Sequence, residues 1–292
     1  MIKKGIILAG GTGTRLSPLT KAVNKQLLPI YDKPLIFYPL SILMLANIKN
    51  VLMIVNPGQI ENFKSLLGNG KRFGIKIQYK IQKKPKGLAD AFILGKSFIK
   101  KDNVALILGD NFFYGQSLTD KLRKSLTHNI GSRIFLKSVQ TPENFGVATI
   151  VNNKIKKIIE KPKKFISSYA ITGLYFFDNK VVDYAKKLKP SKRGEIEITD
   201  ILNIYKDSGD LYYEHIGRGA IWSDAGKIED MTNISSFVQS VEKVQSIKIA
   251  CLEEIALSKK WINKKTIQKN IKFYGNCDYG NYLKKLKNLE EK

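Results

Sequence analysis

The sequence predicts an α/β fold in which a mostly parallel sheet is buried between layers of helices. In the first half of the chain, short apolar runs alternate with longer stretches of helical pattern. The middle contains more strands and fewer helices, and the part from residue 228 onward is helical. We therefore expect a catalytic domain at 1–227, which includes a β-rich insertion, and a C-terminal helical appendage at 228–292.

The first half supplies the expected parallel strands, at residues 5–8, 51–55, 75–81, 104–108 and 134–139. Expected helices lie between them, at 36–46, 59–67, 88–99 and 117–127. These strands are apolar along their length and do not alternate with polar residues. That pattern is typical of parallel strands covered on both faces.

The middle strands are expected at 147–151, 155–159, 173–177 and 211–216. Asn152 and Asn153 lie between the first two, where they indicate a hairpin turn. After residue 228, apolar side chains recur at roughly helical spacing, at Phe237, Val241, Val244, Ile249, Leu252, Ile255 and Ala256.

The charge of the chain does not favour a nucleic-acid partner. The net charge is +25, but only six of the 50 basic residues are arginine, and the lysines are scattered. Base reading and bidentate phosphate binding favour arginine. No apolar run is long enough for a membrane span, and the run after Gly5 is too short for a signal peptide. Cys251 and Cys277 form no paired motif, so we expect a cytoplasmic protein.

A glycine-rich loop, residues 10–16 (Gly-Gly-Thr-Gly-Thr-Arg-Leu), follows the first expected strand. Such a loop lets backbone N–H groups approach phosphate oxygens closely, and a helix starting after it would add its dipole. Arg15 offers a fork of donors for the same oxygens. Leu16 stands where a dinucleotide fingerprint has its third glycine, and the loop lacks the Gly-Lys-Ser/Thr ending of a Walker A motif. The alternative interpretation is a tight strand-to-helix turn.

Lys25 comes soon after this loop, in Lys25-Gln26-Leu27-Leu28-Pro29. Alone it could be an exposed lysine in a loop. Because the glycines, Arg15 and Lys25 lie within sixteen residues, we expect them to hold the phosphates of one ligand.

The segment 10–29 resembles the signature of the sugar-nucleotide pyrophosphorylases, and further segments resemble the long-form glucose-1-phosphate thymidylyltransferase branch of that family. These are Tyr31-Asp32-Lys33-Pro34, Tyr38-Pro39-Leu40-Ser41, Leu106-Ile107-Leu108-Gly109-Asp110-Asn111, Phe113-Tyr114-Gly115, Thr172-Gly173-Leu174-Tyr175, Arg193-Gly194-Glu195, Glu197-Ile198-Thr199-Asp200, Gly217-Arg218-Gly219 and 249–256. The matches are in order and cover essentially the whole chain.

The resemblance implies a Rossmann-like, mostly parallel (mixed) sheet with a sugar-binding β-rich insertion. It also implies Mg²⁺-dependent transfer of dTMP from dTTP to glucose 1-phosphate, giving dTDP-glucose and pyrophosphate, the first step toward dTDP-rhamnose and other deoxysugars. Three alternatives stay open: a relative that uses UTP or another nucleotide or a different sugar, a non-catalytic regulatory protein of the same fold, and a dinucleotide-dependent oxidoreductase.

The resemblance also implies the site residues. Arg15, Lys25 and Lys161 would be catalytic, and Asp110 and Asp224 would hold Mg²⁺. Carboxylates at strand ends do face the ligand crevice of α/β sheets, although an aspartate there is more often a turn or a helix cap. Substrate binding would also involve other positions. Those lining the nucleotide would be Leu8, Gly10, Gly11, Thr12, Gly13 and Thr14, and those near the thymine base would be Gln26, Gln82 and Gly87. Those around the sugar phosphate would be Asn111, Gly146, Glu160, Ile171 and Thr172, together with Lys161.

Some positions depart from the family pattern, namely Ile159 for a second glutamate, Phe145 for a tyrosine, and Ser223 and Ala225 beside Asp224. None of these is an assigned ligand. The long helical tail resembles that of homotetramers inhibited by dTDP-rhamnose at a subunit interface. The residues in the corresponding segments are Gly115, Arg218, Gly219 and Glu254. Plain packing is the alternative role for all four.

Overall fold

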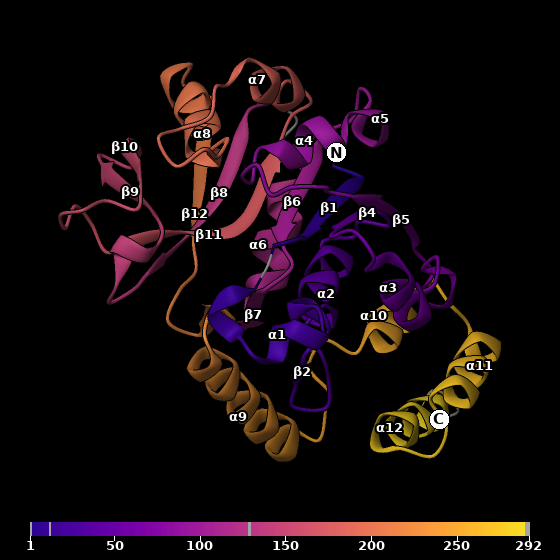
Figure 1. Ribbon diagram of the computed structural model, residues 1–292. Coiled ribbons are helices and arrows are strands. Elements are labelled where there is room, and N and C mark those ends of the chain that lie inside the picture. The colour runs from indigo at the N-terminus through magenta and orange to yellow at the C-terminus, as the bar shows by residue number, and fades with distance from the viewer. Residues whose placement is uncertain (1, 12, 128–129, 290–292) are drawn as a thin grey trace.

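The computed structural model describes residues 2–11, 13–127 and 130–289. Within these ranges, nine strands form a mixed sheet whose main path is β10-β9-β11-β6-β1-β4-β5, and β8 extends from β11 with β12 beside it. β1 pairs in parallel with β4 and β6, and β4 pairs in parallel with β5. β11 runs antiparallel to β6, β8 and β9, so it connects the parallel half to the β-rich half (Figure 1). The mixed α/β sheet is the expected fold class.

The strands of this sheet are β1 (Lys4–Ala9), β4 (Asn50–Val55), β5 (Lys76–Ile81), β6 (Val104–Leu108), β8 (Ser132–Ser138), β9 (Gly146–Val151), β10 (Lys154–Glu160), β11 (Tyr169–Phe177) and β12 (Leu211–His215). Two further pairs are antiparallel, β2 (Pro29–Ile30) with β3 (Lys33–Pro34), and β7 (Asn111–Gly115) with β13 (Ala220–Asp224).

The helices are α1 (Leu19–Ala22), α2 (Phe37–Leu45), α3 (Ile60–Leu67), α4 (Asp90–Leu94), α5 (Lys96–Ile99), α6 (Leu118–Leu126), α7 (Val181–Lys187), α8 (Ile198–Asp207), α9 (Ile228–Gln245), α10 (Leu252–Ser258), α11 (Lys264–Tyr274) and α12 (Asp278–Leu289). Short 3-10 turns occur at Thr14–Leu16, Lys25–Leu27, Lys71–Phe73 and Pro142–Asn144. None of the helices described is long and apolar enough to cross a lipid bilayer.

The sheet is buried on both faces because successive strand residues point to opposite sides. Ile6 of β1 packs in the core shared with α4, α7 and α8, whereas its neighbour Ile7 packs in the core shared with α2, α3 and α6. Figure 1 shows these two helical layers on opposite sides of the strands. The apolar strand pattern in the sequence therefore reflects burial on two sides.

The C-terminal helices α10, α11 and α12 share the second of these cores. Leu252, Ile267, Ile271 and Leu283 belong to the same buried cluster as α2. α2 is apolar around its whole circumference, and every residue from Phe37 to Met44 is buried. Because the tail covers the side of α2 that faces away from the sheet, the appendage contributes to the main core.

Other elements were not predicted. The stretch expected as one helix at 88–99 is split at Gly95 into α4 and α5, where a Cβ would lie 2.9 Å from the Ile6 side chain. Strand β7 was missed, because it is short and finds its partner, β13, about a hundred residues away. The helices α7 and α8 lie in the part expected to be rich in strands.

Candidate active site

The glycine loop and Asp110 leave the sheet side by side. Leu8 of β1 is the register partner of Leu108 of β6, and the Gly109 N–H donates to the Leu8 carbonyl at 2.9 Å. Both loops therefore begin at the carboxyl ends of neighbouring parallel strands, which is where α/β sheets bind ligands.

The loop needs glycine for its backbone shape. Gly11 has φ +103° and Gly13 has φ +60°, both in the left-handed region. Asn56, at the end of β4, fixes the loop by accepting from the Gly11 N–H at 3.1 Å and donating to its carbonyl at 2.6 Å. Thr12, an expected ligand, lies outside the described residues. Only a three-residue 3-10 turn, which includes Thr14, follows Gly13, so phosphate binding would depend on loop amides and side chains and little on a helix dipole.

Lys25 and Asp110 form an ion pair at the edge of the sheet, with the ammonium 2.7 Å from the carboxylate. Burial alone would raise the pKa of Asp110, but the Lys25 charge and hydrogen bonds from Lys25 and Asn111 lower it overall. The Asn111 amide donates to Asp110 at 2.9 Å and accepts from the Gly173 N–H at 3.1 Å and the Trp222 indole at 2.6 Å. Asn111 was expected to bind substrate, and in this structure its side chain holds Asp110 in place.

Asp224 lies next to Asp110, as expected. It is the last residue of β13 and the register partner of Asn111, and the N–H of Ala225 donates to the Asp110 carbonyl at 2.8 Å. Burial and then the Asp110 carboxylate raise the pKa of Asp224, against smaller opposing effects of Lys25 and Arg15. Four of the five charged side chains expected at the reaction centre, all but Lys161, therefore lie close enough to influence one another.

Arg15 faces the same spot as Asp224. A Cβ built on Gly226 would lie 2.9 Å from a carboxylate oxygen of Asp224 and 3.6 Å from a guanidinium nitrogen of Arg15. Arg15 is exposed, so its side chain can meet a ligand that enters from solvent. Two cationic side chains and two carboxylates therefore lie next to the glycine loop.

Of the residues expected near the base, Gln82 lies beside the glycine loop and Gln26 lies beside Gly109. A Cβ on Gly10 would lie 2.9 Å from the Gln82 side-chain oxygen, and the Gln82 amide nitrogen donates to Asp90 at 2.9 Å. Gln26 is buried, and its side-chain oxygen has no hydrogen-bond partner among the described residues. Gly87 has φ +97°, and a Cβ there would lie 2.4 Å from the Ile196 carbonyl. An unpaired buried amide oxygen is suited to accept a donor from a ligand.

The residues expected near the sugar gather where β9, β10 and β11 meet. A Cβ on Gly146 would lie 3.2 Å from a Glu160 oxygen and 3.7 Å from Ile171. Thr172 is fully buried, and its hydroxyl has no hydrogen-bond partner among the described residues. Burial and then the nearby Glu197 raise the pKa of Glu160. Lys161 is exposed directly after β10, with its N–H bonded to the Phe145 carbonyl at 3.0 Å.

Two residues near these groups were missed by the sequence reasoning. Arg193 lies 3.5 Å from Glu160, 3.4 Å from Glu195 and 3.5 Å from Glu197, and so draws three carboxylates together. Asn56 clamps the glycine loop. Arg193 lies in a recognised motif, which could have identified it, whereas Asn56 follows an ordinary strand and carries no local signal.

A cavity of about 590 Å³ is lined in part by residues of α2, β7 and α10, and Gly115, Gly219 and Glu254 are among its lining residues. Glu254 accepts from the Tyr282 hydroxyl at 2.8 Å. Arg218 is exposed on the turn beside Gly219 and does not line this cavity. The structure therefore brings together three of the four residues expected at an effector site.

The two carboxylates fit a divalent cation. Asp224 forms no ion pair among the described residues, and Asp110 has one, with the Lys25 ammonium, which a bound cation would have to share. A shared positive ion would relieve the repulsion that, after burial, raises the pKa of Asp224. No cluster of three or more His, Cys, Asp or Glu residues that could hold a metal occurs within the described ranges. A cation here would thus complete its shell with water and ligand oxygens, as Mg²⁺ commonly does.

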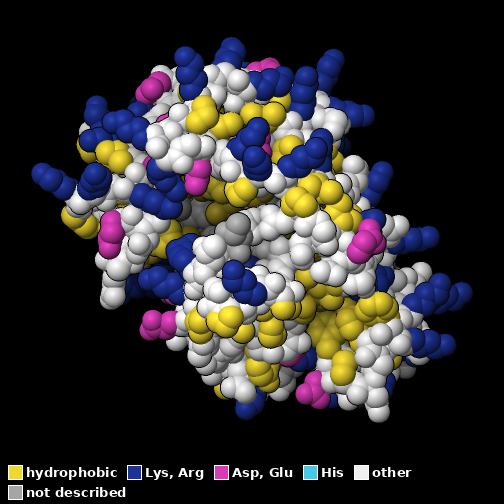
Figure 2. Space-filling view, viewed as in Figure 1, with side chains coloured by type: hydrophobic (Ala, Val, Ile, Leu, Met, Phe, Trp, Pro, Cys, Tyr) yellow, Lys and Arg dark blue, Asp and Glu magenta, His cyan; other side chains and the backbone are white. Residues whose placement is uncertain are grey.

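The basic side chains do not gather into one patch on the face drawn in Figure 2. They spread over most of that face, as expected for a solvated lysine-rich surface.

Residues 4–241 match the nucleotidyl transferase family. A glucose-1-phosphate thymidylyltransferase of Neisseria meningitidis is 49% identical over 97% of this chain and 99% of its own length. The enzyme of that name from Mycobacterium tuberculosis is 41% identical over 97% and 98%. Among solved structures, a candidate glucose-1-phosphate thymidylyltransferase of Bacillus anthracis, in complex with sucrose, has a TM-score of 0.75 at 42% identity, covering 80% of this chain and 94% of that one. A UDP-glucose pyrophosphorylase complexed with UDP-glucose has a TM-score of 0.72 at 25% identity, covering 82% and 99%.

Proposed function

This chain belongs to the nucleotidyl transferase family, and from that premise we propose that it is a glucose-1-phosphate thymidylyltransferase, which transfers dTMP from dTTP to α-D-glucose 1-phosphate and releases pyrophosphate. The observation that carries the proposal is the convergence of Arg15, Lys25, Asp110 and Asp224 at the carboxyl ends of β1 and β6. Near-full-length relatives of that name support the choice of nucleotide and sugar.

The reaction is an in-line displacement. A phosphate oxygen of glucose 1-phosphate attacks the α-phosphorus of dTTP, and the bond from that phosphorus to the bridging oxygen of pyrophosphate breaks. The attacking phosphate is already anionic, so no protein nucleophile or base is needed. Catalysis then comes from positioning and charge stabilisation. Arg15 and Lys25 meet the triphosphate, and Lys161 holds the incoming phosphate beside it.

We propose Mg²⁺ as the divalent ion, held by Asp110 and Asp224. When bound, it would offset negative charge on the α-phosphate and on the pyrophosphate leaving group. Lys25 has a second role here, because its ion pair with Asp110 keeps that carboxylate ionised and ready to bind a cation. The unpaired amide oxygen of Gln26 can accept a donor from the base.

Purified protein with Mg²⁺, glucose 1-phosphate and each of dTTP, UTP, ATP and GTP in separate reactions tests the proposal. We expect pyrophosphate release with dTTP, and dTDP-glucose as the second product. Release with UTP and none with dTTP would make the chain a relative of the UDP-glucose pyrophosphorylases. No release with any of them would indicate a non-catalytic member of the family.

Arg15→Ala tests the charge stabilisation directly. We expect turnover to fall by about a hundredfold or more, the effect of removing one preorganised donor. Lys21→Ala is the matched control, because Lys21 is also an exposed cation and lies in α1 directly after the loop. Equal turnover in the two variants would remove Arg15 from the reaction.

We propose that the cavity lined by Gly115, Gly219 and Glu254 binds dTDP-rhamnose as a feedback inhibitor, with Arg218 reaching the ligand from the adjacent turn. The enzyme would be cytoplasmic and homotetrameric, and sedimentation velocity of the purified protein tests the homotetramer. We expect inhibition by dTDP-rhamnose that added dTTP cannot overcome. Calorimetry should give two dTDP-rhamnose sites per chain. Purely competitive inhibition with a single site would exclude the second site.

A further inference from the structure

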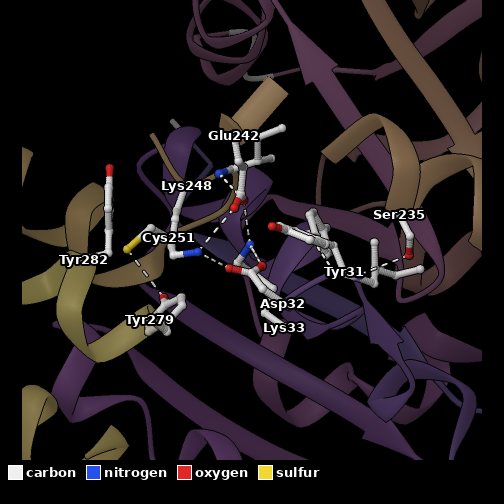
Figure 3. A network of polar contacts seen from close by, with 12 residues as sticks. Tyr31, Asp32, Lys33, Ser235, Glu242, Lys248, Cys251, Tyr279 and Tyr282 are labelled. Atoms are coloured by element: carbon white, nitrogen blue, oxygen red, sulfur yellow. Dashed lines mark hydrogen bonds and ion pairs between the residues drawn. The ribbon is translucent and has the colours of Figure 1, made fainter. Parts of the chain in front are cut away.

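A cluster of buried and half-buried charges lies outside the reaction centre, between the β2–β3 hairpin and α9. It consists of Asp32, Lys33, Glu242 and Lys248 (Figure 3). Lys33 contacts Asp32 and lies 2.9 Å from Glu242. Lys248 also contacts Asp32 and lies 3.4 Å from Glu242. The two positive and two negative groups balance, and none of them is among the residues assigned to a substrate.

Lys33 is the least exposed member of the cluster, at 3%. Its ammonium lies 5.4 Å from the centre of the Tyr38 ring, in addition to its two carboxylate partners. Glu242 also accepts from the backbone N–H of Ile249 at 2.8 Å. Taking such charges out of water costs free energy, and a well-packed apolar group is often as stable. Burial of Lys33 and Glu242, with two further charges half-buried beside them, therefore calls for a role other than stability.

Backbone hydrogen bonds connect Lys33 to the reaction centre. Lys33 pairs with Ile30 across the hairpin, and the next rung joins the Leu35 N–H to the Leu28 carbonyl at 3.0 Å. The Ile36 N–H then donates to the Gln26 carbonyl at 2.9 Å. Gln26 is the residue next to Lys25.

The other end of the connection is α9. The Tyr31 N–H donates to the Ser235 hydroxyl at 3.0 Å, and Figure 3 shows Tyr31 turned toward Ser235 on one side of the cluster. The hairpin residues Leu28 and Ile30 pack in one small core with Leu16 of the glycine loop and Met231 of α9. The charges thus join the hairpin to a helix that follows Asp224 in the chain.

We propose that Lys33 is a positioning residue, which holds the hairpin against α9 through Glu242 and so keeps the Lys25 ammonium against Asp110. Lys33 itself contacts no substrate. Its effect reaches the reaction through the hydrogen-bonded segment 25–36.

Lysine labelling tests the position of Lys25 without any assumption about the reaction. The side chain of Lys25 is 9% exposed and that of Lys64 is 48% exposed, so Lys64 serves as an internal reference for acetylation by N-hydroxysuccinimidyl acetate. In Lys33→Met we expect the labelling rate of Lys25, relative to Lys64, to rise by about tenfold, as local opening exposes it. An unchanged ratio, measured by peptide mass spectrometry, would overturn the proposal.

The kinetic test rests on the proposed thymidylyl transfer. In Lys33→Met we expect kcat to fall by about 10- to 100-fold, the usual effect of a misplaced group, while KM changes much less. Lys64→Met, which removes an exposed ion pair, should keep the wild-type kcat. Wild-type protein with no activity would refute the proposed function and leave the labelling result to decide the role of Lys33.

A double variant separates positioning from stability. Lys33→Met with Glu242→Gln removes one charge of each sign, so no uncompensated buried charge remains and the melting temperature should recover toward wild type. The kcat should stay low, because the link between hairpin and helix is still missing. Recovery of kcat together with the melting temperature would show that Lys33 only stabilises the fold, which would overturn the proposal.

Discussion

Asn111→Leu removes the amide that connects the carboxylate of Asp110, the proposed metal ligand, to the rest of the sheet. Its side chain makes hydrogen bonds with Asp110, with the Gly173 N–H and with the Trp222 indole N–H, and it is 1% exposed. The variant leaves the last two donors buried without an acceptor, at about 1–3 kcal/mol each. Asp110 keeps Lys25 as a partner.

We expect the free energy of unfolding to fall by about 2–4 kcal/mol, because the apolar burial of leucine offsets part of the loss. The protein contains only Trp222 and Trp261, so urea titration in a Trp261→Phe background reports on the indole that loses its acceptor. We also expect the emission of folded Trp222 to change and turnover to fall, since Asp110 loses one of its two side-chain restraints.

Asn62→Leu is the control for Asn111→Leu, because Asn62 is exposed on α3 and the one side-chain partner it has among the described residues is the neighbouring Gln59. It should change the free energy of unfolding by less than about 0.5 kcal/mol. If Asn111→Leu were equally mild and left the Trp222 emission unchanged, the hydrogen bonds assigned to Asn111 could not be what fixes Asp110.

Burial and neighbouring acidic groups raise the pKa of Asp224, so its carboxyl group binds a proton more tightly in the folded chain than in the unfolded chain. This group therefore lowers the stability of the fold as pH rises from the ordinary carboxyl pKa of 3.8 through the raised pKa. Asp224→Asn should therefore be more stable than wild type at pH 7 in metal-free buffer, and it should be inactive. Mg²⁺ should raise the melting temperature of wild type and leave that of the variant unchanged. A variant that is less stable than wild type and still responds to the metal would contradict this. Gly87→Ala should lose stability and dTTP affinity, because its Cβ would lie 2.4 Å from the Ile196 carbonyl at φ +97°, and unchanged calorimetry would refute that strain. A thiol reagent should label the exposed Cys277 rapidly in native protein and leave buried Cys251, whose pKa burial raises, until urea is added; early labelling of both would contradict the burial.

The sequence was sufficient to predict the parallel strands and the glycine loop, because burial on two faces and left-handed backbone leave local patterns. Strand β6 has the expected bounds, and β1, β4 and β9 differ by a residue or so. The resemblance supplied Asp110 and Asp224, and the structure brings them together through the pairing of β7 with β13.

That pairing could not be predicted locally, since it joins segments about a hundred residues apart and each strand is too short to show its own periodicity. The same holds for the role of Lys33, which lies in the recognised motif Tyr31-Asp32-Lys33-Pro34 but carries no local sign of an ion pair with a distant helix. Its burial depends on Glu242, which a different part of the chain brings to it. The roles of Asn56 and Arg193 also come from contacts between distant segments.

The helix α2 has consequences for how this enzyme can be shortened. It is apolar around its whole circumference because strands of the sheet cover one face of the helix and the C-terminal helices cover the opposite face. A chain that ended after α9 would expose the second face of α2 to water and would be prone to aggregate. Any compact version without the tail would need new polar side chains on α2, so loss of the tail and redesign of that helix would have to occur together.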